Sequence, residues 1–200
     1  VYAASNAGSN NITISDSRIS GSAYRGLQIN GGNTGFSLLD SEVFGNTTYG
    51  IEVYGAGALI ACNDVYGNTN TGIYASGSTA GAAAAIRIEG NRVRENGNRG
   101  VDVNNNVDVV GNEIFSHIGS SRLGIEASSG ARITDNFIHR NTTGLSLYNG
   151  AVATGNEIYA NQGRVVTVYS ALLSVNLIYS NATVIDDAGY PLGQNGQQPV

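Results

Sequence analysis

One short motif recurs along almost the whole chain and constrains its fold more than any other feature. The motif is Asn, any residue, an aliphatic residue, two further residues and Asn, followed by a turn, a Gly and alternating aliphatic residues. It is clearest at Asn91–Asn96, which is followed by Gly100–Val103. It recurs about every 20 to 28 residues, a period typical of solenoids, in which each repeat forms one coil stacked on its neighbours.

The alternation of aliphatic and polar residues within each repeat predicts β-strands rather than helices. Strands that occupy the same phase of successive repeats must stack in parallel, about 4.8 Å apart. A right-handed crossover is the strong preference for parallel strands. The sequence therefore predicts an all-β fold, a right-handed parallel β-helix of about eight coils.

Two columns of Asn mark the corners of the predicted coils. Asn tolerates left-handed backbone conformations, so we expect it to form the corners themselves. Stacked amide side chains can bond from one coil to the next, which satisfies polar groups that would otherwise be buried unpaired. The first column is Ser17, Ser41, Asn63, Asn91, Asn112, Asn136, Asn156 and Asn176. The second column is Ser22, Asn46, Asn68, Asn96, His117, Asn141, Asn161 and Asn181.

The repeat indicates a single β-helical domain over residues 1–183. Residues 184–200 depart from the motif and carry Pro191, so we expect them to cap the end of the rod. The largest insertion, residues 76–85, is rich in Ala and Gly. The chain opens on Val1-Tyr2-Ala3, which matches the middle of a coil at Ile73-Tyr74-Ala75. We therefore expect the chain to be part of a longer protein.

Charge and hydropathy argue against several classes of partner. The chain has a net charge of −5 and contains no Lys, so no basic patch is available for a nucleic-acid backbone. No apolar run approaches the roughly 18 residues of a membrane span. Cys62 is the single cysteine and falls at a predicted corner, where a small turn residue is expected. His117 and His139 fall on different faces, so they do not indicate a shared metal site.

One outward column, on the strand after each Gly, is a candidate ligand face made of Glu52, Tyr74, Asp102 and Glu126. The carboxylates could bind Ca²⁺ or act as an acid–base pair. Alternatively, they are ordinary polar residues on a solvated strand. Asp102 and Glu126 fall on consecutive coils, so their charges should repel and raise the pKa of one of them. The full column is Tyr2, Gln28, Glu52, Tyr74, Asp102, Glu126, Ser146 and Thr167.

A second outward column is rich in aromatic residues. These side chains could stabilise one another by stacking on adjacent strands. They could instead form a flat strip that docks sugar rings or another protein, because an exposed apolar strip of this length is unusual on a monomer. The candidate strip is Phe44, Tyr66, Phe115, Tyr159 and Tyr179, and Ser20, Arg94 and His139 fill the other positions of the column.

Over about residues 10–183 the chain resembles the right-handed β-helix repeat superfamily, which includes pectate lyases and mannuronan C5-epimerases. In its enzymes the strand after the Gly carries the active groove. The segment Tyr49–Tyr54 is similar to the epimerase motif: Tyr49 matches the family tyrosine and Glu52 the aspartate of Asp-Pro-His-Glu. Tyr54 replaces the histidine, and the chain contains no Asp-Pro-His-Glu and no Lys to neutralise a substrate carboxylate.

These features leave two hypotheses for function. The first is a non-catalytic β-helical segment of a secreted or cell-surface protein, which acts as a rigid scaffold and as a surface for polysaccharide or another surface protein. The second is the C-terminal part of a polyuronate-active enzyme, a C5-epimerase or a polysaccharide lyase. The missing motif favours the first hypothesis. Ca²⁺, through Asp102 and Glu126, is the one cofactor that the sequence suggests.

Overall fold

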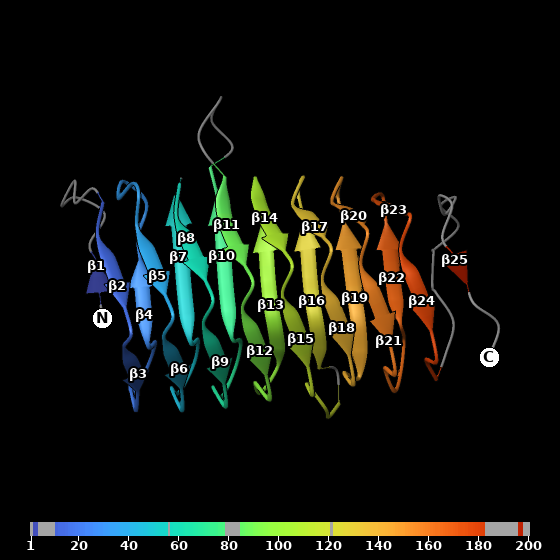
Figure 1. The fold of residues 1–200 in the computed structure, drawn as a ribbon, viewed down its shortest axis with the longest axis horizontal. Coiled ribbons are helices and arrows are strands. Elements are labelled where there is room, and N and C mark those ends of the chain that lie inside the picture. Colours follow the sequence, from blue (N-terminus) through green and yellow to red (C-terminus); the bar gives the residue numbers. More distant parts are fainter. Residues whose placement is uncertain are drawn as a thin grey trace.

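The computed structural model is a rod built from β-strands (Figure 1). It describes residues 2–3, 11–55, 57–78, 85–120, 122–182 and 196–197, and the first and last pairs are described as backbone only. The predicted cap at 184–200 lies almost wholly outside the described residues, as does most of the insertion at 76–85. None of the described residues forms a helix with the length and hydropathy needed to span a membrane.

Each coil contributes one strand to each of three parallel sheets. Sheet 1 contains β1 (Tyr2–Ala3), β4 (Leu27–Ile29), β7 (Ile51–Gly55), β10 (Ile73–Gly77), β13 (Arg99–Asn104), β16 (Leu123–Ser128), β19 (Thr143–Tyr148) and β22 (Val166–Tyr169). Sheet 2 contains β2 (Thr13–Ser15), β5 (Ser37–Leu39), β8 (Leu59–Ala61), β11 (Ile86–Glu89), β14 (Val107–Val110), β17 (Arg132–Thr134), β20 (Val152–Thr154) and β23 (Leu172–Ser174). Sheet 3 contains β3 (Arg18–Ser20), β6 (Glu42–Phe44), β9 (Asp64–Tyr66), β12 (Arg92–Arg94), β15 (Glu113–Phe115), β18 (Phe137–His139), β21 (Glu157–Tyr159), β24 (Leu177–Tyr179) and β25 (Gly196–Gln197).

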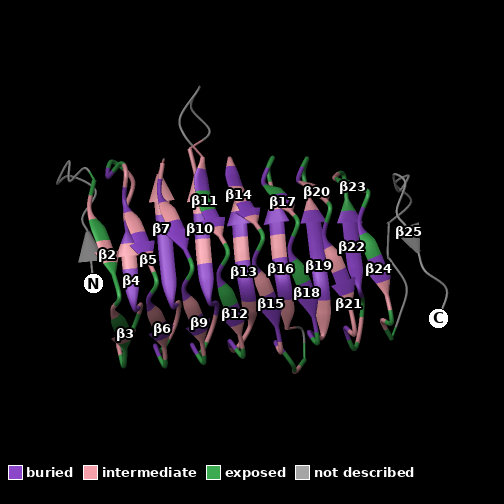
Figure 2. Ribbon diagram, viewed as in Figure 1, coloured by how far each residue is buried: buried purple, intermediate pink, exposed green. Residues whose placement is uncertain are grey.

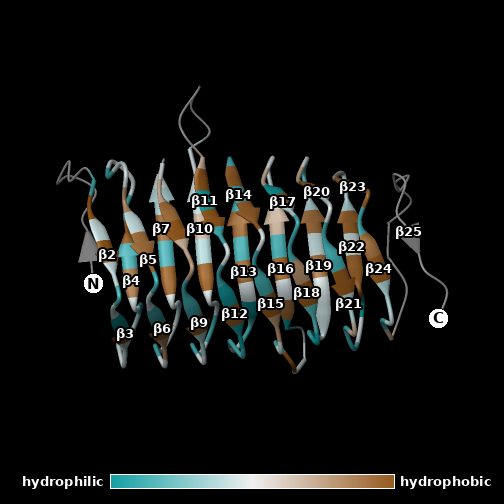
Figure 3. Ribbon diagram, viewed as in Figure 1, coloured by the Kyte–Doolittle hydropathy of each residue, from teal (hydrophilic) through white to brown (hydrophobic). Residues whose placement is uncertain are grey.

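The pairing confirms the predicted parallel β-helix and its phase. On sheet 1, Ile51 pairs with Ile73, and Ile73 pairs with Val101, so the inward aliphatic residues of successive coils lie directly over one another. The core is therefore a set of aliphatic columns inside the rod, where each fully buried side chain contributes roughly 1.5–3 kcal/mol. Figures 2 and 3 show this alternation, with buried hydrophobic positions between exposed polar ones along the strands.

The Asn ladders are also present. In the first ladder, the side-chain amide of Asn112 donates to Oδ1 of Asn136 at 2.9 Å, and Asn136 donates to Oδ1 of Asn156 at 2.9 Å. Each amide also donates to main-chain carbonyls; that of Asn136 bonds Val109 and Thr134. The ladder side chains therefore hold consecutive coils together in a buried setting.

The corner geometry corrects one expectation, because the ladder Asn residues do not carry the left-handed conformation. The residue before each of them does: Cys62 has φ 58° before Asn63, and Asp135 has φ 56° before Asn136. The Asn side chain is free to point inward because its neighbour makes the turn. The positive-φ residues before the first ladder are Asp16, Asp40, Cys62, Gly90, Gly111, Asp135, Gly155 and Val175.

At the start of the sheet 1 strands from β4 to β19, a Gly is needed for close approach and not for a left-handed turn. A Cβ at Gly72 would lie 2.6 Å from Nδ2 of Asn96 and 2.7 Å from the carbonyl oxygen of Gly100. Neither distance leaves room for a methyl group. The repeated Gly therefore lets the second Asn ladder pack against the start of sheet 1.

Candidate functional site

The candidate ligand column on sheet 1 forms one continuous row. Register pairing joins Glu52 to Tyr74, Tyr74 to Asp102 and Asp102 to Glu126. The row extends to Gln28 on one side and to Ser146 and Thr167 on the other. The side chains that the sequence placed on one face are therefore neighbours, although they do not share one environment.

Glu52 is covered by neighbouring side chains and is only 2% exposed. Nε of Arg25 lies 2.5 Å from its Oε2, a contact without hydrogen-bond geometry, and the Tyr54 hydroxyl donates to its Oε1 at 3.2 Å. The Tyr74 ring packs against Tyr49 and Tyr54, with centroids 5.7 and 5.6 Å apart. The alternative of an ordinary solvated residue therefore does not hold for Glu52, because Arg25 and Tyr54 contact its buried carboxylate.

The two tyrosines beside Glu52 are held in the neutral form. Burial, followed by the charge of Glu52, raises the pKa of Tyr54 to about 12. Burial and the charges of Glu52 and Asp102 also raise the pKa of Tyr49. At neutral pH both phenols therefore act as hydrogen-bond donors, and neither is suited to abstract a proton.

Arg99 lies between the two other carboxylates of the row. Its Nη1 is 3.3 Å from Oδ2 of Asp102, and its Nε is 3.1 Å from Oε2 of Glu126. The pKa of Asp102 is raised to about 6, mainly by burial and further by Glu126, while Arg99 opposes the shift. The expected rise of one pKa is confirmed, but burial and not charge repulsion is its main cause.

The same geometry does not fit the suggested calcium site. Ca²⁺ requires six to eight oxygen ligands, and the Arg99 guanidinium already contacts both Asp102 and Glu126. Within the described part of the chain, no three His, Cys, Asp or Glu side chains gather where they could hold a metal ion.

An open pocket of about 260 Å³ continues the face of sheet 1 beyond Glu126. Ser146 and Thr167 lie in its floor and are almost fully buried, so they place hydroxyl groups beneath it. Tyr148 and Tyr169 stack at its edge, with centroids 5.5 Å apart and nearly parallel planes. The pocket is lined by Leu123, Glu126, Thr143, Ser146, Tyr148, Arg164, Thr167 and Tyr169.

The aromatic column on sheet 3 is a stack. His139 lies between Phe115 and Tyr159, with ring centroids 5.2 and 4.7 Å away, and Tyr159 stacks on Tyr179 at 5.2 Å. At the other end, Phe44 stacks on Tyr66 at 5.0 Å. Phe115 and His139 are 8% and 5% exposed, so the rings cover one another and present mainly their edges. This burial favours the self-stacking alternative.

We expect the double variant Tyr159→Ser, Tyr179→Ser to be less stable than the parent by roughly 1–3 kcal/mol, because it removes two stacked pairs worth about 0.5–1.5 kcal/mol each. Chemical denaturation measures the loss. Leu177→Ser, an exposed position on the same sheet, is the matched control and should change stability little. An undiminished free energy of unfolding in the double variant would instead favour the docking-strip alternative.

Sequence reasoning missed Arg25 and Arg99, which hold the carboxylates of sheet 1. Both residues directly precede the Gly that opens a strand, as Tyr49 does, and lie three residues before an outward position of the row. The signal was therefore available as a third outward column. In this column Tyr49 and Thr71 separate Arg25 from Arg99, and Leu123 and Thr143 follow, which hid the pattern.

Comparison with known proteins agrees with this architecture. Residues 79–196, more than half of the chain, match the family described as "Right handed beta helix region". The chain therefore belongs to the right-handed β-helix family, and the predicted hand of the solenoid is confirmed. Among curated proteins, none matches the sequence.

Three solved structures share the fold. The A-module of the mannuronan C-5 epimerase AlgE4 from Azotobacter vinelandii has 16% identity and a TM-score of 0.66, over 94% of this chain and 58% of its own. The AlgE6 A-module from the same organism has 18% identity and a TM-score of 0.69, over 95% and 59%. A point mutant of the periplasmic alginate epimerase AlgG has 18% identity and a TM-score of 0.69, over 92% and 49%. This chain thus spans about half to three fifths of these proteins.

Proposed function

We propose that this chain is a polysaccharide-binding β-helix and that its ligand lies on the outer face of sheet 1. The observation that carries the proposal is the pocket beside Glu126, which is lined by the Ser146 and Thr167 side chains and by the stacked Tyr148 and Tyr169 rings. Hydroxyl groups and aromatic ring faces are the two kinds of surface that a sugar unit needs.

A uronate polymer is the ligand class we favour. Arg164 lines the pocket, so its guanidinium could pair with a sugar carboxylate. The similar solved structures are alginate epimerases, one of them periplasmic, which agrees with a polyuronate ligand and a location outside the cytoplasm. A scaffold role is compatible with the same rod, because its core and ladders do not depend on a ligand.

Binding to mannuronate, guluronate and galacturonate oligomers by isothermal titration calorimetry tests this proposal. We expect Arg164→Ala and Tyr169→Ser each to weaken binding about tenfold, the loss of one charged hydrogen bond or one aromatic contact. Arg132→Ala on sheet 2 is the control and should bind like the parent. The proposal fails if no uronate oligomer binds, or if the sheet 1 variants bind as tightly as the control.

The second hypothesis, the C-terminal part of a polyuronate enzyme, is favoured by the placement of Tyr49, Glu52 and Tyr54 around one point on sheet 1. For this chain alone we expect neither epimerisation nor β-elimination of alginate or pectate. Both reactions need a base for the proton next to the carboxylate, but Glu52 is covered by Arg25 and both tyrosines are neutral. Proton NMR of treated mannuronan and ultraviolet absorbance of unsaturated products check this. Turnover that Glu52→Gln abolishes would establish the enzyme hypothesis.

A further inference from the structure

We propose that a notch at the corner between sheets 2 and 3 binds a neutral hexopyranose ring. The corner notch is the pocket of about 400 Å³ lined by Gly90, Asn91, Arg92, Gly111, Glu113, Phe137 and Tyr159. Its size is within the range of ligand sites, roughly 300–1,000 Å³. It lies on a different face from the sheet 1 pocket, so this proposal does not rest on the proposed function.

The notch exists because two consecutive corners lack side chains. A Cβ at Gly111 would meet no atom within 4 Å, and a Cβ at Gly90 would meet only Sγ of Cys62, at 3.9 Å. The corners on either side carry Cys62 and Asp135. The Asp135 carboxylate lies over Gly155, away from the notch. A ligand can therefore approach the main chain over two coils, between flanking side chains.

The polar wall of the notch is a carboxylate in a fixed orientation. Oε1 of Glu113 lies 3.2 Å from Nε2 of His139, and its Oε2 accepts a hydrogen bond from Nε of Arg92 at 3.3 Å. The Arg92 guanidinium is itself held over the Phe115 ring at 4.9 Å. A carboxylate has about four acceptor sites, so each oxygen can still accept a bond from one of two neighbouring sugar hydroxyls.

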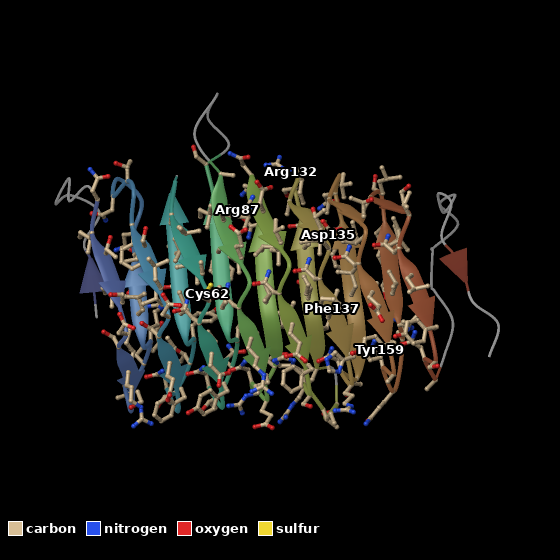
Figure 4. The ribbon with its side chains drawn as sticks, in the orientation of Figure 1. Cys62, Arg87, Arg132, Asp135, Phe137 and Tyr159 are labelled. Atoms are coloured by element: carbon tan, nitrogen blue, oxygen red, sulfur yellow. The ribbon has the colours of Figure 1, made fainter. Side chains whose placement is uncertain are left out.

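The apolar wall is Phe137, which follows Glu113 in register on the next coil. Its side chain is 47% exposed, and Tyr159 lies on the coil after it, so two rings border the notch (Figure 4). Phe137 is the one aromatic side chain among the described residues at this outward position of sheet 3. The other occupants are Arg18, Glu42, Asp64, Arg92, Glu113, Glu157, Leu177 and Gly196.

An exposed ring next to a fixed carboxylate matches the two sides of a pyranose, an apolar C–H face and an edge of hydroxyl groups. The charges of Arg92 and Glu113 neutralise each other at 3.3 Å, so the notch offers no net positive charge to an acidic sugar. A uronate carboxylate close to Glu113 would be repelled. The ligand class is therefore a neutral hexose, free or as one unit of a glycan.

The test is to measure binding of cellopentaose, maltopentaose and mannopentaose by saturation-transfer NMR and calorimetry. Gly111→Asp fills the notch with a residue that other coils already carry at this corner, at Asp16, Asp40 and Asp135. Gly45→Asp is the matched control, because Gly45 also has a positive φ and open space around its Cβ but lies at another corner. We expect at least one oligomer to bind the parent protein. Gly111→Asp and Phe137→Ser should each weaken that binding at least about tenfold, whereas Gly45→Asp should bind the oligomer as tightly as the parent does.

Melting temperatures of the variants separate lost binding from lost folding, and Tyr169→Ser separates this notch from the sheet 1 pocket. We expect Tyr169→Ser to bind the neutral oligomer as the parent does. The proposal is overturned if no neutral oligomer binds, or if binding persists in folded Gly111→Asp and Phe137→Ser. Binding of uronate oligomers alone would also overturn it, while leaving the sheet 1 proposal intact.

Discussion

Replacing Asn136 with Leu should lower the free energy of unfolding by roughly 3–5 kcal/mol, because the change disrupts the first ladder at its centre. Oδ1 of Asn136 accepts bonds from both the main-chain and the side-chain nitrogen of Asn112. Its amide donates to Asn156, Val109 and Thr134. Leu fills much of the same volume but can make none of these bonds. The buried main-chain N–H of Asn112 then has no acceptor in its own ladder.

Urea denaturation followed by circular dichroism measures this loss. Asn98→Leu is the control, since Asn98 is partly exposed and its bonds to Asn70 and Leu123 are made by main-chain atoms. We expect the control to change stability by less than about 0.5 kcal/mol. If Asn136→Leu and Asn98→Leu melted alike, the buried ladder would contribute no more than a surface amide, and the coil-to-coil bonds would not explain the stability of the rod.

The coil phase could be predicted because it depends on local chemistry that each repeat spells out. A polar residue such as Asn136 can be buried at a corner only if its side chain finds a hydrogen-bond partner, which the stacked Asn of the next coil supplies. A Gly such as Gly72 recurs where the ladder leaves no space for a Cβ. These two constraints fix which residues point inward. The fold, the ladders and both outward columns follow from them.

The environments of the outward residues could not be predicted in the same way. They depend on contacts between coils whose lengths differ: Asn63 bonds Asn91, 28 residues on, but Asn91 bonds Asn112 after only 21. Side-chain direction decides the rest. Arg25 turns toward the next coil and covers Glu52, and Arg99 reaches both Asp102 and Glu126. The corner notch depends on where Asp135 points, which the sequence does not specify.

His117 interrupts the run of Asn residues in the second ladder, and its titration should make the stability of the rod depend on pH. The buried imidazole takes the place of an Asn: its Nδ1 lies 2.9 Å from Oδ1 of Asn141, and its Nε2 lies 3.3 Å from Nδ2 of Asn96. This network assigns the hydrogen to Nδ1 and leaves Nε2 as the acceptor. Protonation of Nε2 would set two donors against each other without a bond.

Burial lowers the pKa of His117 to about 4, from the ordinary 6.5 that it has in the unfolded chain. Between these values the unfolded chain binds a proton that the folded chain does not, so acidification favours unfolding. The contribution of the neutral His117 to the free energy of unfolding is complete above pH 6.5 and is lost as the pH falls toward 4. At 1.36 kcal/mol per unit of pKa, the loss is about 3 kcal/mol.

The titration of Asp102 changes the stability in the opposite direction over nearly the same range of pH. Its pKa is about 6 in the folded chain and 3.8 in the ordinary reference state, so the folded chain binds the extra proton. Acidification from pH 6 to pH 4 therefore stabilises the fold by about 3 kcal/mol through this group. The two effects nearly cancel, and we expect the parent protein to show little of either.

Single variants should reveal both contributions. His117→Asn restores an amide that can accept from Asn96, so relative to the parent it should gain about 3 kcal/mol of stability as the pH falls from 6.5 to 4. Asp102→Asn removes the opposing group and should lose about 3 kcal/mol relative to the parent over pH 6 to 4. Urea denaturation at half-unit pH intervals gives both difference curves, in which the surface carboxylates shared by all three proteins cancel. The prediction is wrong if the two difference curves have the same sign or if the curve for His117→Asn is flat. A flat curve would mean that the pKa of the buried imidazole is no lower in the folded chain than in the unfolded chain, so that His117 has no effect on acid stability.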